Sequence, residues 1–362
     1  MNLDSLTTAL NSDIGILHPF GRKIEQCYDC MEQFLISWYS YQFRYCFMNN
    51  SGLILLLAIF IIISAVLSPN FLTVGNFLNL LQQASIPGIV AIGMTLVILL
   101  GGIDLSVGSV MAFSGMIASI IVEKMGGNIG SIIIGCIAGL AIGALMGTIT
   151  GILISRFRLP DFIASLAMME MARGAALLTT SGNPVFGLSK EFHVLGGGFV
   201  FGKVAISGIF WIVLTVFFAL ILKYTVFGRS LFAIGGNREA AMLSGIKTKR
   251  NYALTYMLSG LLAGFAGILT ASWMSTGQPT AGDGYELDAI AASVIGGASL
   301  SGGMGSVSGT FGGVFLLRII TNIFNLVGLP SYYQRIAKGV IIIFALLLNG
   351  FVANDKKNSR KK

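Results

Sequence analysis

Charged residues are scarce in this sequence of 362 residues: only 10% are Asp, Glu, Lys or Arg, whereas 55% are hydrophobic. Soluble domains carry roughly 25% charged residues, so this composition excludes a chain that covers a water-facing surface in the usual way. The mean hydropathy of +0.83 and the 47 glycines agree with this, because small residues let helices pack closely in lipid. The sequence therefore predicts an all-α integral membrane protein.

Cysteine and histidine are also rare, with four and two residues. Cys27 and Cys30 form one C-x-x-C pair, but a zinc site of this kind needs a second pair. The two histidines lie far apart and have no cysteine or acid constellation around them. Residues 197–203 match G-x-x-x-x-G-K, but Val204 replaces the Ser or Thr that a P-loop needs for magnesium. We therefore expect no metal, no cofactor, no catalytic residue and no ATP hydrolysis in this chain.

The formal net charge is +8, but the basic residues flank apolar runs, which indicates membrane topology rather than nucleic-acid binding. The connection 223–250 holds six basic residues against one acid, and the turn 156–158 and the tail 353–362 are also basic. Because basic loops stay in the cytoplasm, we expect all three there. Both termini are then cytoplasmic, which requires an even number of crossings.

Apolar stretches of about 17–25 residues are needed to cross a bilayer as a helix, and about ten occur here. Residues 1–50 precede them without the features of a signal peptide, so we expect a cytoplasmic extension or an overcalled start, with Met48 as an alternative initiator. The transmembrane domain then covers 51–352. The eighth candidate is short enough to be re-entrant or broken. The candidates are 51–67, 85–101, 105–122, 129–155, 161–181, 206–223, 251–272, 287–299, 305–327 and 335–352.

The two halves of this domain, about 51–181 and 206–352, resemble each other. With five spans in each half, the copies enter the membrane from opposite sides, which is the inverted-topology repeat of many transporters. The matching motifs come in the same order: F-L-T-V-G-N at 71–76 with F-A-I-G-G-N at 232–237, G-I-D-L at 102–105 with G-Y-E-L at 284–287, and G-G-N-I-G-S at 126–131 with G-G-M-G-S at 302–306.

A glycine at every fourth position places small residues on one face of a helix. We expect these ladders to be sites of tight helix packing, and the alternative is a close backbone approach along a transport pathway. The first ladder is Gly135, Gly139, Gly143, Gly147 and Gly151, and the second is Gly305, Gly309 and Gly313.

Asp104 and Glu286 occupy corresponding places in the repeat, each before a run of short residues. An acid among apolar spans is a functional-site hypothesis. Each carboxylate can cap the start of a broken helix, contact a polar substrate, or relay a proton or cation. Asp288 could be the true N-cap in the second half, leaving Glu286 free. We take Asp104, Ser106, Glu286 and Asp288 as pathway or helix-break residues, and expect Asp104 toward the cytoplasm and Glu286 on the opposite side.

A short helix is predicted within the basic connection 223–250, where E-A-A is followed by a glycine four residues later. Lying on the membrane surface with small residues outward, it is suited to docking a partner. The alternative is an ordinary solvated loop helix. The candidate coupling residues are Gly236, Asn237, Arg238, Glu239, Ala240, Ala241 and Gly245.

Several motifs together resemble the permease subunits of bacterial ribose-type monosaccharide ABC importers, a branch of the branched-chain amino acid and ribose permease superfamily. They are G-G-I-D-L-S-V-G-S at 101–109, G-G-N with E-A-A at 235–241, the stretch 278–292, and S-Y-Y-Q at 331–334. The resemblance covers roughly residues 50–352. It implies about ten helices arranged as in vitamin B12-type importers, a bacterial inner-membrane location and a homodimer. It also implies a separate cytoplasmic ATPase that binds the E-A-A segment, and a periplasmic or lipid-anchored sugar-binding protein.

The leading hypothesis is therefore a monosaccharide permease, with ribose as the best substrate. One alternative is an autonomous ion-coupled transporter that uses Asp104 and Glu286 as carriers. Another is a permease of the same family for a non-sugar, such as a furanone signal or a branched-chain amino acid. Polar candidates for substrate contact, such as Thr95, Ser106, Asn322 and Gln334, cannot be distinguished by pattern.

Overall fold

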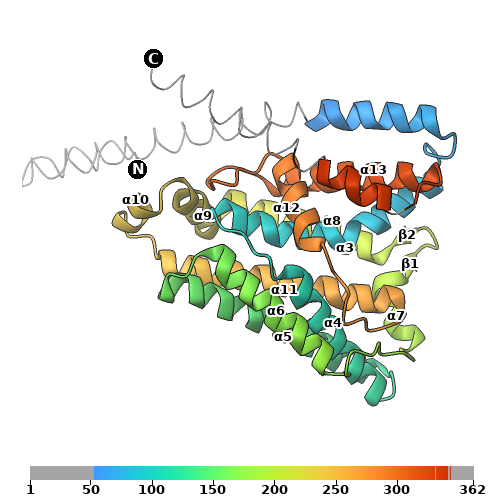
Figure 1. Ribbon diagram of the computed structural model, residues 1–362, viewed down its shortest axis with the longest axis horizontal. Coiled ribbons are helices and arrows are strands. Elements are labelled where there is room, and N and C mark those ends of the chain that lie inside the picture. The colour runs from blue at the N-terminus through green and yellow to red at the C-terminus, as the bar shows by residue number, and fades with distance from the viewer. Residues whose placement is uncertain (1–52, 331, 341–342, 344–362) are drawn as a thin grey trace, which may run out of the picture. The chain divides into compact units, whose positions relative to one another are not determined.

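Helices make up nearly all the regular structure of the computed structural model, which describes residues 53–330, 332–340 and 343 (Figure 1). These residues belong to one compact unit of the chain. The extension 1–50 with Cys27 and Cys30, the tail 353–362 and most of the predicted span 335–352 lie outside the described residues.

All ten predicted spans overlap a helix among the described residues. Six of these helices are long and apolar enough to cross a membrane, so the all-helical membrane class is confirmed, while the count of ten crossings stays a prediction. A helical stretch Leu53–Leu67 comes first and helical residues 332–340 come last. Between them lie α3 (Val74–Leu99), α4 (Val107–Lys124), α5 (Ile129–Phe157), α6 (Asp161–Leu178), α7 (Lys190–Gly197), β1 (Phe199–Val200), β2 (Val204–Ala205), α8 (Ile206–Tyr224), α9 (Val226–Gly236), α10 (Arg238–Leu243), α11 (Thr248–Met274), α12 (Tyr285–Ile295) and α13 (Val307–Leu326).

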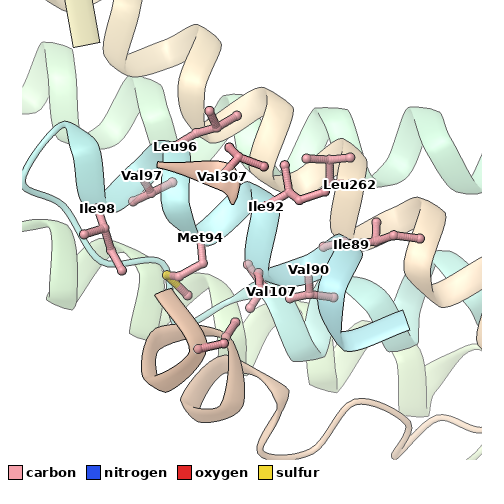
Figure 2. Packing of buried hydrophobic residues seen from close by; sticks show 14 of the residues in the cluster. Ile89, Val90, Ile92, Met94, Leu96, Val97, Ile98, Val107, Leu262 and Val307 are labelled. Atoms are coloured by element: carbon pink, nitrogen blue, oxygen red, sulfur yellow. The ribbon is translucent and has the colours of Figure 1, made fainter. Parts of the chain in front are cut away.

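The centre of the unit is α3, whose apolar residues are buried on all sides from Ala84 onward. Such a helix is expected in the core of a membrane bundle. By contrast, α5 and α8 bury only 28% of their most apolar windows and expose isoleucine, valine and leucine outward. Figure 2 shows Ile89, Val90, Ile92, Met94, Leu96, Val97 and Ile98 of α3 among Val107, Leu262 and Val307.

The first glycine ladder lies on the face of α5 that packs against α4 and α11. A β-carbon placed on Gly135 would lie 2.9 Å from Ala118 O, and one placed on Gly139 would lie 2.9 Å from Ser114 O. Gly147 lies in the same way against Tyr256 O of α11. Since these neighbours are helix backbone, any side chain would push the helices apart. The predicted role of the ladder in tight packing is confirmed.

The helices of the two halves pack in an exchanged pattern. In the proposed repeat α3 corresponds to α11, α4 to α12 and α5 to α13. In the structure α3 packs against α12 and α13 of the other half, while α11 packs against α4 and α5. Each half therefore packs this corresponding helix, α3 or α11, against the later helices of the other half. Two related halves with matching surfaces are expected to pack in this reciprocal way, so the packing supports the repeat.

The short elements gather at the two ends of the long helices. Figure 1 shows α9 and α10 at one end, and α7, β1 and β2 at the other. The two strands form an antiparallel hairpin, pairing Phe199 with Ala205. We refer below to the α10 end and the α7 end.

Candidate functional site

Asp104 lies in a non-helical stretch between α3 and α4 and is only 1% exposed. Its Oδ1 accepts hydrogen bonds from the Ser106 backbone N–H (3.0 Å) and from Ser106 Oγ (2.6 Å). Its Oδ2 accepts a third bond from Ser259 Oγ, at 2.8 Å. Ser106 is the N-cap of α4 but makes no capping bond with its own side chain. The carboxylate therefore lies at a helix start, where a negative charge is favoured.

One face of α11 holds the stretch that leads to Asp104. Tyr252, Tyr256 and Ser259 are spaced by four and three residues, so their side chains lie in a row on one face. Tyr252 Oη donates to Leu100 O (3.4 Å), and Tyr256 Oη lies 3.3 Å from Ile103 O. With the bond from Ser259 to Asp104, three hydroxyl groups bind successive points of residues 100–104. We call this face of α11 the hydroxyl row.

Helix α6 also contacts this stretch. Ser165 Oγ is 3.2 Å from Ile103 O, and Asp161 Oδ2 is 3.2 Å from Tyr256 Oη. Non-helical backbone within a membrane bundle needs such partners, because lipid offers no hydrogen bonds. The stretch is therefore supported by polar groups of two helices.

A second non-helical stretch, Ser275 to Gly284, connects α11 with α12 and is held by α6 as well. Arg173 Nη1 donates to Pro279 O (2.7 Å) and to Ala281 O (3.0 Å). Gly284, the N-cap of α12, has a φ of +80°, a conformation that glycine adopts without steric cost. The helix can therefore begin at Tyr285 after a sharp turn.

The first turns of α4 and α12 lie side by side. A β-carbon placed on Gly108 would lie 2.5 Å from Glu286 Oε2, and one placed on Gly282 would lie 2.7 Å from Gly108 O. Gly108 follows Asp104 by four residues, a span of at most about 15 Å, which is half of a hydrocarbon core of about 30 Å. Glu286 therefore lies beside the start of α4, while the expectation that Asp104 lies toward the cytoplasm and Glu286 on the opposite side stays a prediction.

The two helix starts meet because each non-helical stretch turns back into the bundle before its helix begins. Gly101 lies against Ser301 at the α10 end, and Gly277 pairs with Val185 toward the α7 end. From these two ends the chain runs inward, and α4 and α12 both start where the stretches meet. The two helix starts thus point toward each other, an arrangement that places two positive helix ends close together.

Gly284 is the N-cap of α12, so the alternative that Asp288 is the true N-cap is excluded. Asp288 is the fourth residue of α12, and its carboxylate binds two cations instead. Arg318 of α13 is 3.1 Å away and Lys338 is 2.9 Å away. Only 12% of the Asp288 side chain is exposed. This ion cluster of Asp288, Arg318 and Lys338 ties the start of α12 to two other helices.

The candidate coupling residues form a short exposed helix at the α10 end. Gly236 ends α9, and Asn237 Oδ1 caps α10 by accepting from the Ala240 N–H at 3.0 Å. Gly245 has a φ of +83° and ends the segment, as the sequence predicted. Arg238, Glu239 and Ala240 are exposed while Ala241 is buried.

Backbone from the end of α9 meets backbone from the α3–α4 and α12–α13 connections. The Gly303 N–H donates to Leu99 O at 2.9 Å, and Gly235 lies against both groups. A β-carbon placed on Gly302 would lie 2.8 Å from Gly101 N and 2.9 Å from Gly235 Cα. We call the contact of Gly101, Gly235, Gly302 and Gly303 the glycine junction. It joins the end of α9 to the α3–α4 and α12–α13 connections without any intervening side chain.

The polar candidates for substrate contact are bonded within the protein. Thr95 Oγ1 lies 2.7 Å from Thr310 Oγ1, Asn322 Nδ2 donates to Asn76 Oδ1 at 2.9 Å, and Gln334 Nε2 donates to Asn325 Oδ1 at 2.7 Å. Their first role is thus to join helices. Among the described residues, no group of three His, Cys, Asp or Glu side chains is placed to hold a metal ion.

Sequence reasoning missed the residues that hold the two stretches, namely Arg173, Tyr252, Tyr256 and Ser259. The tyrosines and the serine lie in an apolar run. Their spacing of four and three residues places the hydroxyl groups on one helix face, and this was the signal that could have identified them. Arg173 was a second signal, because it is a lone arginine within a predicted span, at a position where charge is costly.

Comparison with known proteins gives clear relatives. The family model described as "Branched-chain amino acid transport system / permease component" matches residues 76–346. The ribose import permease protein RbsC of Bacillus subtilis is 46% identical over 305 residues, covering 83% of this chain and 93% of the relative. That of Escherichia coli K12 is 44% identical, with coverages of 83% and 94%. The L-arabinose ABC transporter permease protein AraH of Azospirillum brasilense is 38% identical, with coverages of 85% and 90%. No solved structure matches the chain.

Proposed function

The chain belongs to the family of permease components of branched-chain amino acid transport systems, and from this premise we propose that it is the membrane-spanning permease subunit of an ATP-driven ABC importer for ribose. Ribose is assigned as the substrate because the chain is 44–46% identical to two ribose import permeases over nearly their whole length. The chain moves the sugar and performs no chemistry on it.

We propose that the ATPase docks on α10. This helix exposes 59% of Met242 and 85% of Leu243, although it lies at an end of the long helices where the connection 223–250 is rich in lysine and arginine. Exposed apolar side chains on a hydrophilic end of a membrane protein favour contact with a soluble partner. A substrate-binding protein would deliver the sugar at the α7 end.

The orientation follows from charge. The basic connection 223–250 contains α9 and α10 at the α10 end (Figure 1). Arg156 and Arg158 end α5, whose last turns pack near the start of α11 through Gly151 and Ala253. Basic residues favour the cytoplasmic side. We place the α10 end and both termini in the cytoplasm of a bacterial inner-membrane protein. A reporter active only in the cytoplasm, fused after residue 243, should be active, and the same reporter fused at Phe201 should be inactive.

Two further assignments belong to this proposal. The resemblance to monosaccharide ABC importers implies two copies of the permease in each importer, so we propose a homodimer. We also keep the division into an N-terminal extension 1–50, a permease domain 51–352 with halves 51–181 and 206–352, and a basic tail 353–362. Cross-linking of two differently tagged copies in membranes tests the dimer.

The function is tested with the whole complex. The chain, the ATPase and the binding protein encoded beside it are co-expressed, purified and reconstituted, and uptake of radiolabelled ribose is measured with and without ATP. Deleting Glu239–Gly245 should remove both the bound ATPase and the uptake. The matched control replaces an exposed apolar residue at the other end, Phe201→Asp, which should keep the ATPase bound.

The ion-coupled alternative gives a different result in the same vesicles. It predicts ribose uptake by the chain alone, driven by an ion gradient and abolished by Asp104→Asn. The non-sugar alternative is tested on the binding protein, where ribose should bind in preference to furanones and branched-chain amino acids. Uptake that needs neither ATP nor the ATPase would refute the importer assignment.

A further inference from the structure

One side chain of the docking helix α10 lies over a buried aromatic ring of the bundle. The Arg238 guanidinium lies over the ring of Tyr252, 4.5 Å from its centroid. Arg238 is exposed, but Tyr252 is 4% exposed and donates through Oη to Leu100 O. A cation over an aromatic face is held by the ring's quadrupole. Arg238 therefore connects the surface helix to the first residue beyond α3.

The hydroxyl row extends this contact toward Asp104. Tyr252 is its first member, and Tyr256 and Ser259 continue along the same rigid face of α11 to Ile103 O and the Asp104 carboxylate. A shift of Tyr252 relative to Leu100 therefore changes the position of the stretch 100–104 against α11. That stretch determines where α4 begins, and α4 begins beside Glu286 and α12.

The glycine junction gives a second contact between the same elements. Gly235, the last residue but one of α9, packs on Leu99 O, while Gly303 packs on Gly236 N. Close-packed backbone has little compliance. A displacement of α9 and α10 must therefore move both the α3–α4 connection and the α12–α13 connection.

We propose that Arg238 is a positioning residue for transport: together with the glycine junction, it passes movement of the docking helix to the starts of α4 and α12. This rests on the proposed function, in which an ATPase moves α10. In this proposal the ATPase binds the outward side chains of α10, such as Met242 and Leu243. Arg238 thus couples the ATPase to the pathway and contributes little to holding the ATPase.

The test separates binding from coupling in the co-expressed complex. Arg238→Met removes the cation and keeps the length of the side chain, and Arg250→Met is the control, since Arg250 is an exposed arginine of the same surface. We expect both variants to purify with a full complement of ATPase. Ribose imported per ATP hydrolysed should fall about fivefold to tenfold in Arg238→Met alone, the effect expected for losing one cation–π contact. Arg238→Lys should restore part of it.

Two further variants test the inner contacts. Tyr252→Phe keeps the ring but loses the bond to Leu100 O, so it should lower the coupling ratio with ATPase still bound. Gly235→Ala places a methyl group in the glycine junction and should do the same. The control is Gly75→Ala in the first turn of α3, where nothing lies within 4 Å of the β-carbon, and it should behave as the unmodified chain.

The outcomes are distinct. Loss of ATPase from Arg238→Met, or an unchanged coupling ratio in that variant and in Tyr252→Phe, overturns the inference and leaves the proposed function standing. If the unmodified chain neither retains the ATPase nor imports ribose with ATP, the proposed function fails and the inference fails with it.

Discussion

Ser259 donates a hydrogen bond of 2.8 Å to Asp104, 155 residues earlier in the chain. The bond joins a helix of the second half to the carboxylate that begins a helix of the first. All three groups bonded to this carboxylate are donors, which is the environment of a structural acceptor. The geometry favours capping over a relay that must release and rebind a proton.

Asp104→Asn should therefore keep the protein folded and active. The amide oxygen can still accept from Ser106, and its N–H group can donate to Ser259 Oγ, so the loss of stability should be about 1 kcal/mol. Asp104→Ala leaves three buried donors without an acceptor and should cost about 1–3 kcal/mol or more. Thermal unfolding in detergent and ATP-driven uptake measure the two effects. An Asp104→Asn variant with normal stability and no uptake would point to a charge-carrying role instead.

Gly147→Ala should destabilise the bundle, because the new methyl group meets the backbone carbonyl of Tyr256. Overpacking of this kind costs about 1–3 kcal/mol. The control is Gly174→Ala in α6, where nothing lies within 4 Å of the β-carbon. Because alanine is the better helix former by up to about 1 kcal/mol, that variant should be neutral or more stable. Equal unfolding temperatures for the two variants would contradict the packing described for α5.

The ion cluster predicts an order of effects. Asp288→Asn leaves Arg318 and Lys338 side by side without an anion, whereas Lys338→Met leaves the Arg318–Asp288 pair intact. Asp288→Asn should therefore be the more destabilising, by about 2 kcal/mol. In a double-mutant cycle, adding Lys338→Met to Asp288→Asn should recover part of the loss. Additive effects in thermal unfolding would show that the two groups do not interact.

Arg173→Met should loosen the stretch before α12, because Pro279 O and Ala281 O lose their shared donor. Arg173→Lys offers only a point charge, so its effect should lie between those of the unmodified chain and Arg173→Met. With Asp283→Cys in a background without the native cysteines, the rate of maleimide labelling should rise about threefold or more in Arg173→Met, as expected for the loss of about 1 kcal/mol of bonding. Met171→Leu, at an exposed position of the same helix, serves as the control and should label at the background rate.

The existence of the helices was predictable from the sequence, but some boundaries were not. The span was predicted to begin at residue 85 because Asn76, Asn79, Gln82 and Gln83 interrupt the apolar run. In the structure these polar residues do not end the helix, which begins at Val74. Asn76 is bonded to Asn322, so a polar residue is tolerated where a distant partner exists. Hydropathy along the chain contains no information about such a partner.

The candidate site was predictable in its residues and not in its geometry. The repeat identified Asp104 and Glu286 as equivalent, and both do lie at helix starts. The meeting of the two helix starts depends on each stretch folding back into the bundle, which no local pattern specifies. Asp288 was misassigned for the same reason: its partners Arg318 and Lys338 are 30 and 50 residues away.

The exchanged packing of the halves has a consequence for how the protein is made. The helices α4 and α5 are complete when synthesis reaches Phe157, but their partner α11 begins only at Thr248. At about 5–20 residues per second, the ribosome needs roughly ten seconds to supply it. Through that interval the glycines of α5 that pack on α11 and the Asp104 oxygen that accepts from Ser259 have no permanent partner, so the inserted first half is not yet fully packed. A chain split after residue 205 should therefore give a stable product only when both pieces are made in the same cell.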